Sequence, residues 1–278
     1  MKAVNYCYEC LSRLAQQAAE LSTHDELTRS TALDQSLKIL KDNFSTDRVS
    51  IVIATKMHDA IKKVSGNSDP YRSMKDKEIE IGRKLSRDLV IDKHDFMACL
   101  KFSALGNSLD FFRPLEVILN DMKQAVNFVI DDTHRFEALA NHAPRMLFLA
   151  DNAGEAFFDL PLLRWLRRRS SVAYVVKSAP VQNDITLADI KLAGLDAELG
   201  EILSTGTATP GIDFTQASPE FIREFSSADL ILAKGMGYYE TLSEFPAEGK
   251  IFYCLRAKCQ PVADSLHVPL NSYVATLR

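Results

Sequence analysis

The hydrophobic pattern of the chain changes near residue 143, and this change constrains the fold more than any other feature. Beyond it, short apolar runs alternate with segments of helical spacing, and the runs cover residues 146–150, 172–176, 230–233 and 251–255. None of these runs alternates apolar with polar residues, so both faces of each strand are expected to be buried. That pattern is typical of a parallel sheet covered by helices on both sides.

Helical spacing, with apolar residues three and four positions apart, accounts for most of the remaining pattern. In the second half it predicts crossover helices over residues 155–168, 186–193 and 219–225. In the first half it predicts a long helix opened by Asp69-Pro70 and helices over residues 8–21, 32–44 and 115–130. The sequence therefore predicts an α/β protein, in which a helical N-terminal region (residues 1–143) packs on a Rossmann-like, mostly parallel doubly wound sheet (residues 144–278).

Composition and charge exclude several classes of protein. Lys and Arg number 33 and Asp and Glu 37, a formal net charge of −4, so no broad basic field favours nucleic acid as a partner. No apolar run approaches the roughly 18 residues of a transmembrane helix, so no membrane partner is expected. Five cysteines among 278 residues form no disulfide framework, which predicts reduced thiols in a cytoplasmic protein. The oligomeric state is left open.

Polar clusters follow the predicted strands, and in parallel sheets ligands bind beyond the carboxyl ends of the strands. These clusters are Asp151-Asn152-Ala153-Gly154-Glu155, Asn183-Asp184-Ile185-Thr186, Thr205-Gly206-Thr207 and Lys234-Gly235-Met236-Gly237. Because the carboxyl ends of parallel strands meet at one edge of the sheet, side chains of several clusters can share a site.

The first cluster has the composition of a metal site. Together with the carboxylate of Asp184, Asp151 and Asn152 would form an oxygen-only set of ligands, which suits Mg²⁺ or Mn²⁺. Gly154 allows a tight entry into the next helix, whose N-terminal amides attract anions. A turn and helix cap would place Asp and Asn at the same positions, and the residues alone leave the two interpretations equally open.

Lys234-Gly235-x-Gly237 has the features of a short anion-binding loop, because glycines let the backbone approach a phosphate and Lys supplies positive charge. The pattern is neither a P-loop, which ends in Gly-Lys-Ser/Thr, nor a dinucleotide fingerprint, which has a third glycine. An ordinary turn between a strand and a helix explains it equally well.

These segments, in this order, resemble a known family. The motifs are Asp69-Pro70-Tyr71, Gly106-Asn107-Ser108-Leu109-Asp110-Phe111, Asp151-Asn152-Ala153-Gly154-Glu155 with Phe158-Asp159, Lys177-x-x-Pro180-x-x-Asn183-Asp184-x-Thr186 and Lys234-Gly235-x-Gly237-x-Tyr239-Glu240. They are similar to those of the metal-dependent damage-control phosphatases, once catalogued as domain of unknown function 89, over almost the whole chain. Cys7-x-x-Cys10 and Lys258-Cys259 resemble the prokaryotic, single-module branch of that family.

The resemblance implies the fold predicted above and an enzymatic function. Members of the family are divalent-metal-dependent phosphatases that hydrolyse small phosphorylated metabolites, such as sugar phosphates or damaged phosphometabolites. By resemblance, Asp151, Asn152 and Asp184 are the catalytic residues that hold the metal, which would be Mn²⁺, Mg²⁺, Co²⁺ or Ni²⁺.

Further site residues are expected from the resemblance and from the chemistry of phosphoryl transfer. Lys234 and the amides around Gly154 are expected to neutralise the phosphoryl oxygens as charge redistributes. Asn107 and Asp110, from the helical half, are expected to close the cleft over the substrate. None of the six His residues lies in a motif, so proton transfer is assigned to carboxylates such as Glu155.

Two alternative functions stay open. The family has also been described as carboxyl methyltransferases, so S-adenosylmethionine-dependent methyl transfer is one alternative, with Gly154 as its glycine turn. A non-catalytic module that binds a metal or a metabolite is the other. A haloacid-dehalogenase phosphatase is disfavoured, because it needs Asp where the chain has Ala153. At Met236 and Tyr238 the chain departs from the family, where Gln and Asn are more usual, which leaves contacts to the organic part of the substrate open.

The cysteines near the two ends of the chain could form a separate metal site. Cys7 and Cys10 would share one face of a helix and could join Cys259. A tetrahedral zinc site needs four ligands, and the sequence indicates no fourth. Buried thiols without metal are therefore the favoured interpretation.

Overall fold

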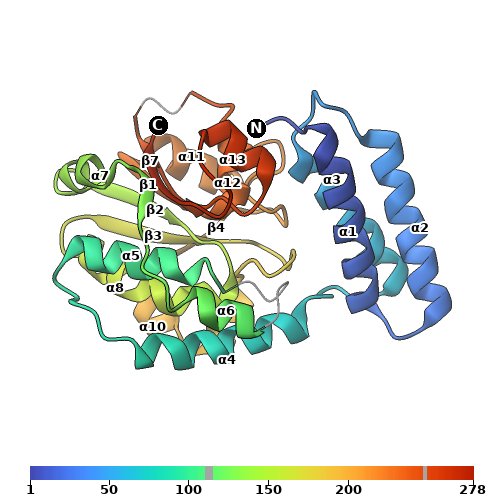
Figure 1. The fold of residues 1–278 in the computed structure, drawn as a ribbon, viewed down its shortest axis with the longest axis horizontal. Helices are drawn as coiled ribbons and strands as arrows, with labels where there is room; N and C mark the ends of the chain where they lie inside the picture. Colours follow the sequence, from blue (N-terminus) through green and yellow to red (C-terminus); the bar gives the residue numbers. More distant parts are fainter. Residues whose placement is uncertain (110–114, 247–248) are drawn as a thin grey trace.

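The chain folds around one seven-stranded sheet, drawn in Figure 1. The structure is a computed structural model and describes residues 1–109, 115–246 and 249–278. The strands are β1 (Phe128–Asp131), β2 (Arg145–Leu149), β3 (Ser171–Val176), β4 (Ile202–Ser204), β5 (Leu230–Lys234), β6 (Ile251–Arg256) and β7 (Tyr273–Leu277). Their order is β1-β7-β6-β5-β2-β3-β4, with β6 and β7 antiparallel and the other neighbours parallel.

Helices cover both faces of the sheet, as the unbroken apolar runs require. The helices are α1 (Asn5–Ser22), α2 (Glu26–Asn43), α3 (Ser50–Ser65), α4 (Arg72–Asp88), α5 (Phe96–Gly106), α6 (Leu115–Asp121), α7 (Thr133–Ala140), the 3₁₀ helix η1 (Ala153–Glu155), α8 (Ala156–Arg167), α9 (Leu187–Ala193), α10 (Asp196–Leu199), α11 (Pro219–Ser227), α12 (Gly235–Leu242) and α13 (Gln260–Leu266). In Figure 1, α4, α5 and α8 lie on the lower side of the sheet, α11–α13 on the upper side, and α1–α3 at the right. Among the described residues, no helix combines the length and apolar content needed to cross a bilayer.

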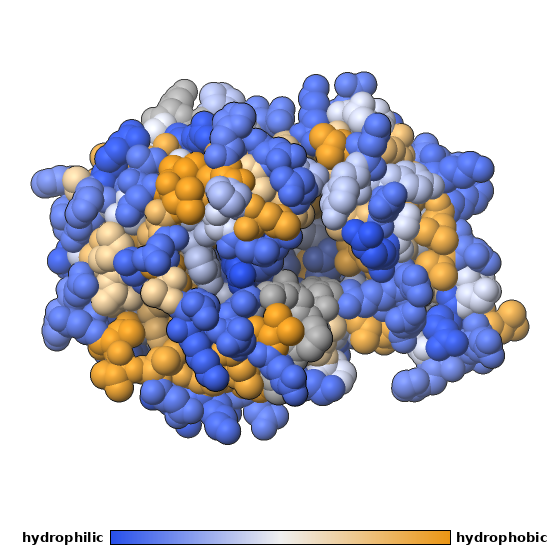
Figure 2. Space-filling view, in the orientation of Figure 1, coloured by the Kyte–Doolittle hydropathy of each residue, from blue (hydrophilic) through white to orange (hydrophobic). Residues whose placement is uncertain are grey.

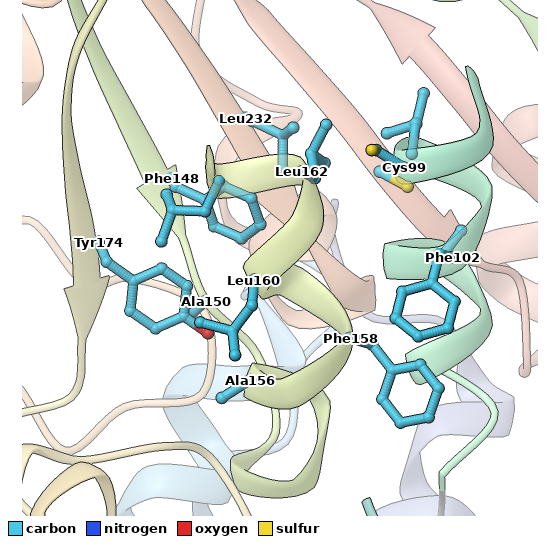
Figure 3. Packing of buried hydrophobic residues seen from close by; sticks show 14 of the residues in the cluster. Cys99, Phe102, Phe148, Ala150, Ala156, Phe158, Leu160, Leu162, Tyr174 and Leu232 are labelled. Carbon is cyan, nitrogen blue, oxygen red and sulfur yellow. The ribbon is translucent and has the colours of Figure 1, made fainter. Parts of the chain in front are cut away.

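Two apolar cores result, one on each face of the sheet, because successive side chains of a strand point to opposite faces. In β2, Phe148 enters one core and Leu147 the other. Phe148 belongs to the core that holds α5 and α8, where the rings of Phe102 and Phe158 lie with centroids 4.9 Å apart (Figure 3). A slip of one residue would exchange the two sets of side chains, so burial on both faces fixes the register of the strands.

The α/β fold with a mostly parallel, doubly wound sheet is confirmed. The predicted strands correspond to β2, β3, β5 and β6, and the predicted crossover helices to α8, α9 and α11. One prediction is wrong: residues 115–130 do not form a single helix, because α6 ends at Asp121 and β1 begins at Phe128. The partner of β1 is β7, in which Tyr273 lies beside Phe128, and local periodicity does not report so distant a pairing. The sheet thus contains a strand from before residue 143, and the division at that residue stays a prediction.

Helices α1–α3 pack around a small core of their own and meet the α/β body through α3. Ser50 Oγ donates to Glu240 Oε2 of α12 at 2.9 Å, and Gln182 Nε2 lies 3.3 Å from Nε2 of the buried His58. Since an amide nitrogen only donates, His58 Nε2 accepts and the imidazole is neutral. Burial, aided by the charge of Lys62, lowers the pKa of His58 to about 3.

Helix α4 crosses the 3₁₀ helix η1 at backbone contact, and two glycines make this crossing possible. A Cβ on Gly82 would lie 2.4 Å from Gly154 O, and one on Gly154 would lie 2.7 Å from Glu78 O. Neither position accepts a larger residue unless α4 moves away from η1. The crossing therefore holds the turn after β2, which carries Asp151 and Asn152, against α4.

Replacing Gly82 by Ala tests this crossing. In an ordinary helix interior the change from Gly to Ala is stabilising by roughly 0.5–1 kcal/mol. Here the added methyl group must displace α4, so we expect Gly82→Ala to lower the free energy of unfolding by about 1–3 kcal/mol in urea denaturation. Lys84→Ala, at an exposed position of the same helix, is the control and should change it by less than about 0.5 kcal/mol. A more stable Gly82→Ala protein would show that the helices are not in tight contact.

The neutral, buried His58 makes stability depend on pH. Its pKa is about 3 in the fold against the ordinary histidine value of 6.5, so at pH values between these two only the unfolded chain takes up the proton. Stability therefore falls as the pH decreases below 6.5, and by pH 5 this group should lower the free energy of unfolding by about 2 kcal/mol. His58→Gln lacks this contribution, so the difference in slope between the two proteins in urea denaturation from pH 7.5 to 5 measures it. Parallel slopes would contradict the prediction.

Candidate active site

The candidate site lies where the strand order reverses, between the neighbouring strands β2 and β5. Asp151 follows β2 and Gly235 follows β5, and the two residues are in contact. Gly235 has a φ of +78°, and a Cβ there would lie 1.9 Å from Asp151 Oδ2. Both the backbone conformation and the carboxylate therefore require glycine at this position.

The turns after β2 and β3 are joined through their backbones, and this brings the predicted metal ligands together. Ile185 N donates to Asp151 O at 2.9 Å. An isolated antiparallel β-bridge links Asn152 with Asp184. Asp151, Asn152 and Asp184 thus lie beside one another at the carboxyl edge of the sheet.

Glu155 orients two amide side chains. Asn152 Nδ2 donates to Glu155 Oε1 at 2.7 Å, and Asn107 Nδ2 donates to the same oxygen at 2.9 Å. Asn107 Nδ2 also donates to Asp151 Oδ2 at 3.0 Å. Because an amide nitrogen only donates and a carboxylate only accepts, these contacts turn the carbonyl oxygen of Asn152 away from Glu155. That oxygen can then contact a cation beside Asp151 and Asp184.

A buried ion cluster lies beneath these residues. Lys234 Nζ donates to Glu155 Oε2 at 3.0 Å and to Asp159 Oδ1 at 2.9 Å. It also donates to Ser103 O at 2.9 Å, and the side chain is not exposed. Burial alone would lower the pKa of Lys234, but the two carboxylates outweigh burial and raise it. An ammonium group has three N–H bonds, and all are used, so this geometry does not support the predicted contact between Lys234 and phosphate.

The pKa values of both carboxylates of the predicted metal site, Asp151 and Asp184, are raised. Burial raises the pKa of Asp184 to about 6, against the opposing charge of Lys177, whose Nζ is 3.5 Å from Asp184 Oδ2. Burial, together with the charges of Glu155 and Asp184, raises the pKa of Asp151 well above its usual range. The contact of Asp184 Oδ2 with Lys177 is longer than an ordinary hydrogen bond, and no described residue makes a shorter one to Asp184 Oδ2. Two neighbouring carboxylates that are buried away from water repel each other, and a cation bound between them relieves this repulsion.

A cavity of about 330 Å³ opens over these residues, between the α/β body and helices α1 and α3. Figure 2 shows the surface hollowed between the body and the three helices. Asn107, Asp151, Asn152 and Asp184 line its polar side, and Lys258 lines it too. In the sequence, Lys258 is recognisable only as part of the motif Lys258-Cys259, and it is not among the predicted site residues. Its position just after β6, at the same edge of the sheet, is the signal that could have identified it.

Two other predicted site residues, Glu155 and Gly154, lie away from the cavity. Glu155 is fully buried beneath the amides that it orients. Gly154 packs against α4, and the flanking amides of Ala153 and Glu155 donate to backbone carbonyl groups, so the geometry does not support phosphate binding by these amides. Asp110 lies outside the described residues.

The cysteines that could have formed a second metal site line the same cavity. These are Cys7, Cys10 and Cys259, and all five cysteines are free. In the described part of the chain, no group of three or more His, Cys, Asp or Glu side chains is arranged to hold a metal. The predicted set of Asp151, Asn152 and Asp184 is of a different kind, because it combines two carboxylates with the amide of Asn152.

Known proteins are similar in sequence to this chain along almost its whole length. Residues 3–274 match the model of the damage-control phosphatase ARMT1-like domain. A damage-control phosphatase of Pyrococcus horikoshii is 34% identical over 283 aligned positions, which cover 99% of this chain and 97% of that one. A damage-control phosphatase of Archaeoglobus fulgidus is 33% identical over 287 positions, which cover 99% of both chains.

A solved structure shares the fold as well. The crystal structure of a protein of the domain-of-unknown-function-89 family from Pyrococcus horikoshii superimposes with a TM-score of 0.88 at 32% identity, covering 100% of this chain and 99% of that one. The likeness therefore includes helices α1–α3 as well as the sheet. The family predicted from the sequence motifs is confirmed: the chain belongs to the damage-control phosphatases with an ARMT1-like domain.

Proposed function

We propose that this protein is a phosphatase that hydrolyses small phosphorylated metabolites with a divalent cation held by Asp151, Asn152 and Asp184. One observation carries the proposal: two neighbouring carboxylates and an oriented amide line a cavity that also contains Lys258. The relatives from Pyrococcus horikoshii and Archaeoglobus fulgidus support it, because both are named damage-control phosphatases.

The three side chains fit a divalent cation such as Mn²⁺, Mg²⁺, Co²⁺ or Ni²⁺. They offer oxygen ligands, and the charges of the two carboxylates match that of the ion. Asp184 Oδ2 contacts Lys177 Nζ at 3.5 Å, which is longer than an ordinary hydrogen bond, and Glu155 directs the carbonyl oxygen of Asn152 away from itself. When bound, such a cation supplies positive charge that polarises a phosphoryl group.

The other residues of the site bind the substrate or position the ligands. Lys258 lines the cavity and would bind phosphoryl oxygens through its charge. Asn107 holds Asp151 through the hydrogen bond to Oδ2. Glu155, paired with Lys234, is a positioning residue that acts through the two amides. Hydrolysis then breaks the ester P–O bond, places the oxygen of water on phosphorus and releases the alcohol.

The geometry of the turn after β2 does not support the methyltransferase alternative. A glycine turn after the first strand of the domain would have to face the cofactor at the edge of the sheet. Gly154 faces Glu78 of α4 instead, with no space for even a Cβ atom. The non-catalytic alternative is separated from the phosphatase by the experiment below.

Replacing Asp184 by Asn keeps the shape of the side chain and removes one of the two ligand charges. We expect hydrolysis of an aryl phosphate with added Mn²⁺ to fall by at least about 100-fold, because a site with one carboxylate holds the ion weakly. The rise in melting temperature that Mn²⁺ gives to the wild type should disappear. Without Mn²⁺, the variant should be at least as stable as the wild type at pH 7.5, because the raised pKa of Asp184 means that its charged form is disfavoured in the fold.

Asp88→Asn, at the exposed end of α4, is the matched control and should change neither hydrolysis nor the effect of Mn²⁺. Near-wild-type hydrolysis by Asp184→Asn, with Mn²⁺ still raising its melting temperature, would show that Asp184 is not a ligand. Stabilisation of the wild type by Mn²⁺ without turnover of any phosphomonoester would instead support the non-catalytic module.

Two lysines near the site have different expected roles, and matched substitutions separate them. Lys234→Met leaves the carboxylates of Glu155 and Asp159 buried without their cation, so we expect the free energy of unfolding to fall by about 3–5 kcal/mol. Lys258→Met changes a partly exposed side chain, so we expect KM to rise at least about tenfold while stability stays within about 1 kcal/mol. Urea denaturation and steady-state kinetics measure the two effects. A stable Lys234→Met protein with a raised KM would instead support a direct contact between Lys234 and the phosphate.

A further inference from the structure

A second cavity, of about 720 Å³, lies away from the candidate active site. Its lining comes mainly from α4 and the segment that follows it, from α8, and from the stretch between α9 and α10. It shares no lining residue with the first cavity. In Figure 1, α4, α8 and α10 lie together below the sheet, whereas α1 and α3, which border the first cavity, lie at the right. A volume of this size is ordinary for a site that binds a small molecule.

Positive charge is concentrated around this second cavity, although the chain as a whole has a net charge of −4. The charged side chains that line it are Arg83, Arg87, Lys93, Arg164 and Glu198. Arg164 forms an ion pair with Glu198, the one carboxylate among them. Within the described ranges, no carboxylate forms an ion pair with Arg83, Arg87 or Lys93. Three positive charges are therefore available to a negatively charged ligand.

The two arginines of α4 are placed so that one anion can contact both. Arg87 follows Arg83 by four positions, so the two lie on the same face of the helix, where like charges repel each other. Arg83 is also fixed in position, because Nη2 donates to Ala193 O at 2.8 Å and Cζ lies 5.5 Å from the centroid of the Phe157 ring. That hydrogen bond uses one of the five N–H donors of the guanidinium, and the others can bind an anionic group. An anion between the arginines would remove their repulsion.

Apolar side chains line the same cavity beside these cations. Leu89, Val90 and Leu192 are 39%, 96% and 65% exposed, and the rings of Phe102 and Phe157 line the cavity as well. Single exposed apolar residues are ordinary, but these lie together around one cavity. An alkyl or aryl group placed against them would remove apolar surface from water and so favour binding.

We propose that the second cavity is a binding site for a small organic anion, in which an anionic group such as phosphate is attached to an alkyl or aryl body. The anionic group binds between Arg83 and Arg87, with further positive charge from Lys93. The apolar body lies against Val90 and Leu192. The site is separate from the phosphatase function proposed above, because no predicted metal ligand lines this cavity.

Three probes test the two halves of this ligand. They are octylphosphonate, methylphosphonate, which lacks the apolar body, and 1-octanol, which lacks the charge. Titration calorimetry uses the full chain in buffer depleted of divalent cations, so that no metal in the first cavity binds the phosphonates. We expect octylphosphonate to bind at least about tenfold more tightly than either of the other two. Absence of octylphosphonate binding, or equal affinity for methylphosphonate or 1-octanol, would overturn the inference.

Substitutions at exposed positions test where octylphosphonate binds. Arg87→Gln and Lys93→Gln each remove one positive charge from the second cavity and should weaken binding at least about threefold. Lys84→Gln, at an exposed position of α4 that does not line the cavity, is the matched control and should change the affinity by less than about twofold.

Lys258→Met, which removes a cation from the first cavity, should leave the affinity for octylphosphonate unchanged. Wild-type affinity in both Arg87→Gln and Lys93→Gln would overturn the inference. A loss of affinity in Lys258→Met larger than that in Arg87→Gln would place the probe in the first cavity and would overturn it too.

Discussion

The geometry of the candidate site depends on the carboxylate of Glu155. One of its oxygens accepts hydrogen bonds from Asn152 and Asn107, and the other accepts from Lys234. An ionised carboxylate in a protein interior is costly unless it is paired, so Lys234, which also binds Asp159, makes this arrangement possible. The amides at the floor of the cavity are thus oriented by a charge that is buried away from solvent.

Close backbone packing holds the buried ion cluster and the turn after β2 in place. The glycine pair of α4 and η1 brings α4 against the turn after β2, and Gly235 lets the turn after β5 meet the carboxylate of Asp151. Side chains at these positions would separate the elements that carry the predicted ligands. The same contacts therefore serve the stability of the fold and the shape of the site, while α1 and α3 supply the far side of the cavity.

Sequence patterns predicted the centre of the sheet better than its edge. Strands such as β2 and β5 are buried on both faces and read as unbroken apolar runs, which are visible locally. β1 is four residues long with alternating burial, and it exists because β7 pairs with it from the other end of the chain. The neighbourhood of Asp151, Asn152 and Asp184 could be predicted because strand ends share one edge. Their binding of a metal stays a prediction.

By itself, the sequence determined which segments form the central strands and helices and which polar residues follow the strand ends, because periodicity is a local property of the chain. Only the tertiary structure decided where those polar side chains point. Lys234 and Lys258 both lie at the ends of strands, yet Lys234 is turned beneath the site and Lys258 lines the cavity. The reason is physical: Lys234 is held by Asp159 of α8 and by Ser103 of α5, acceptors that distant segments bring to it only when the chain has folded.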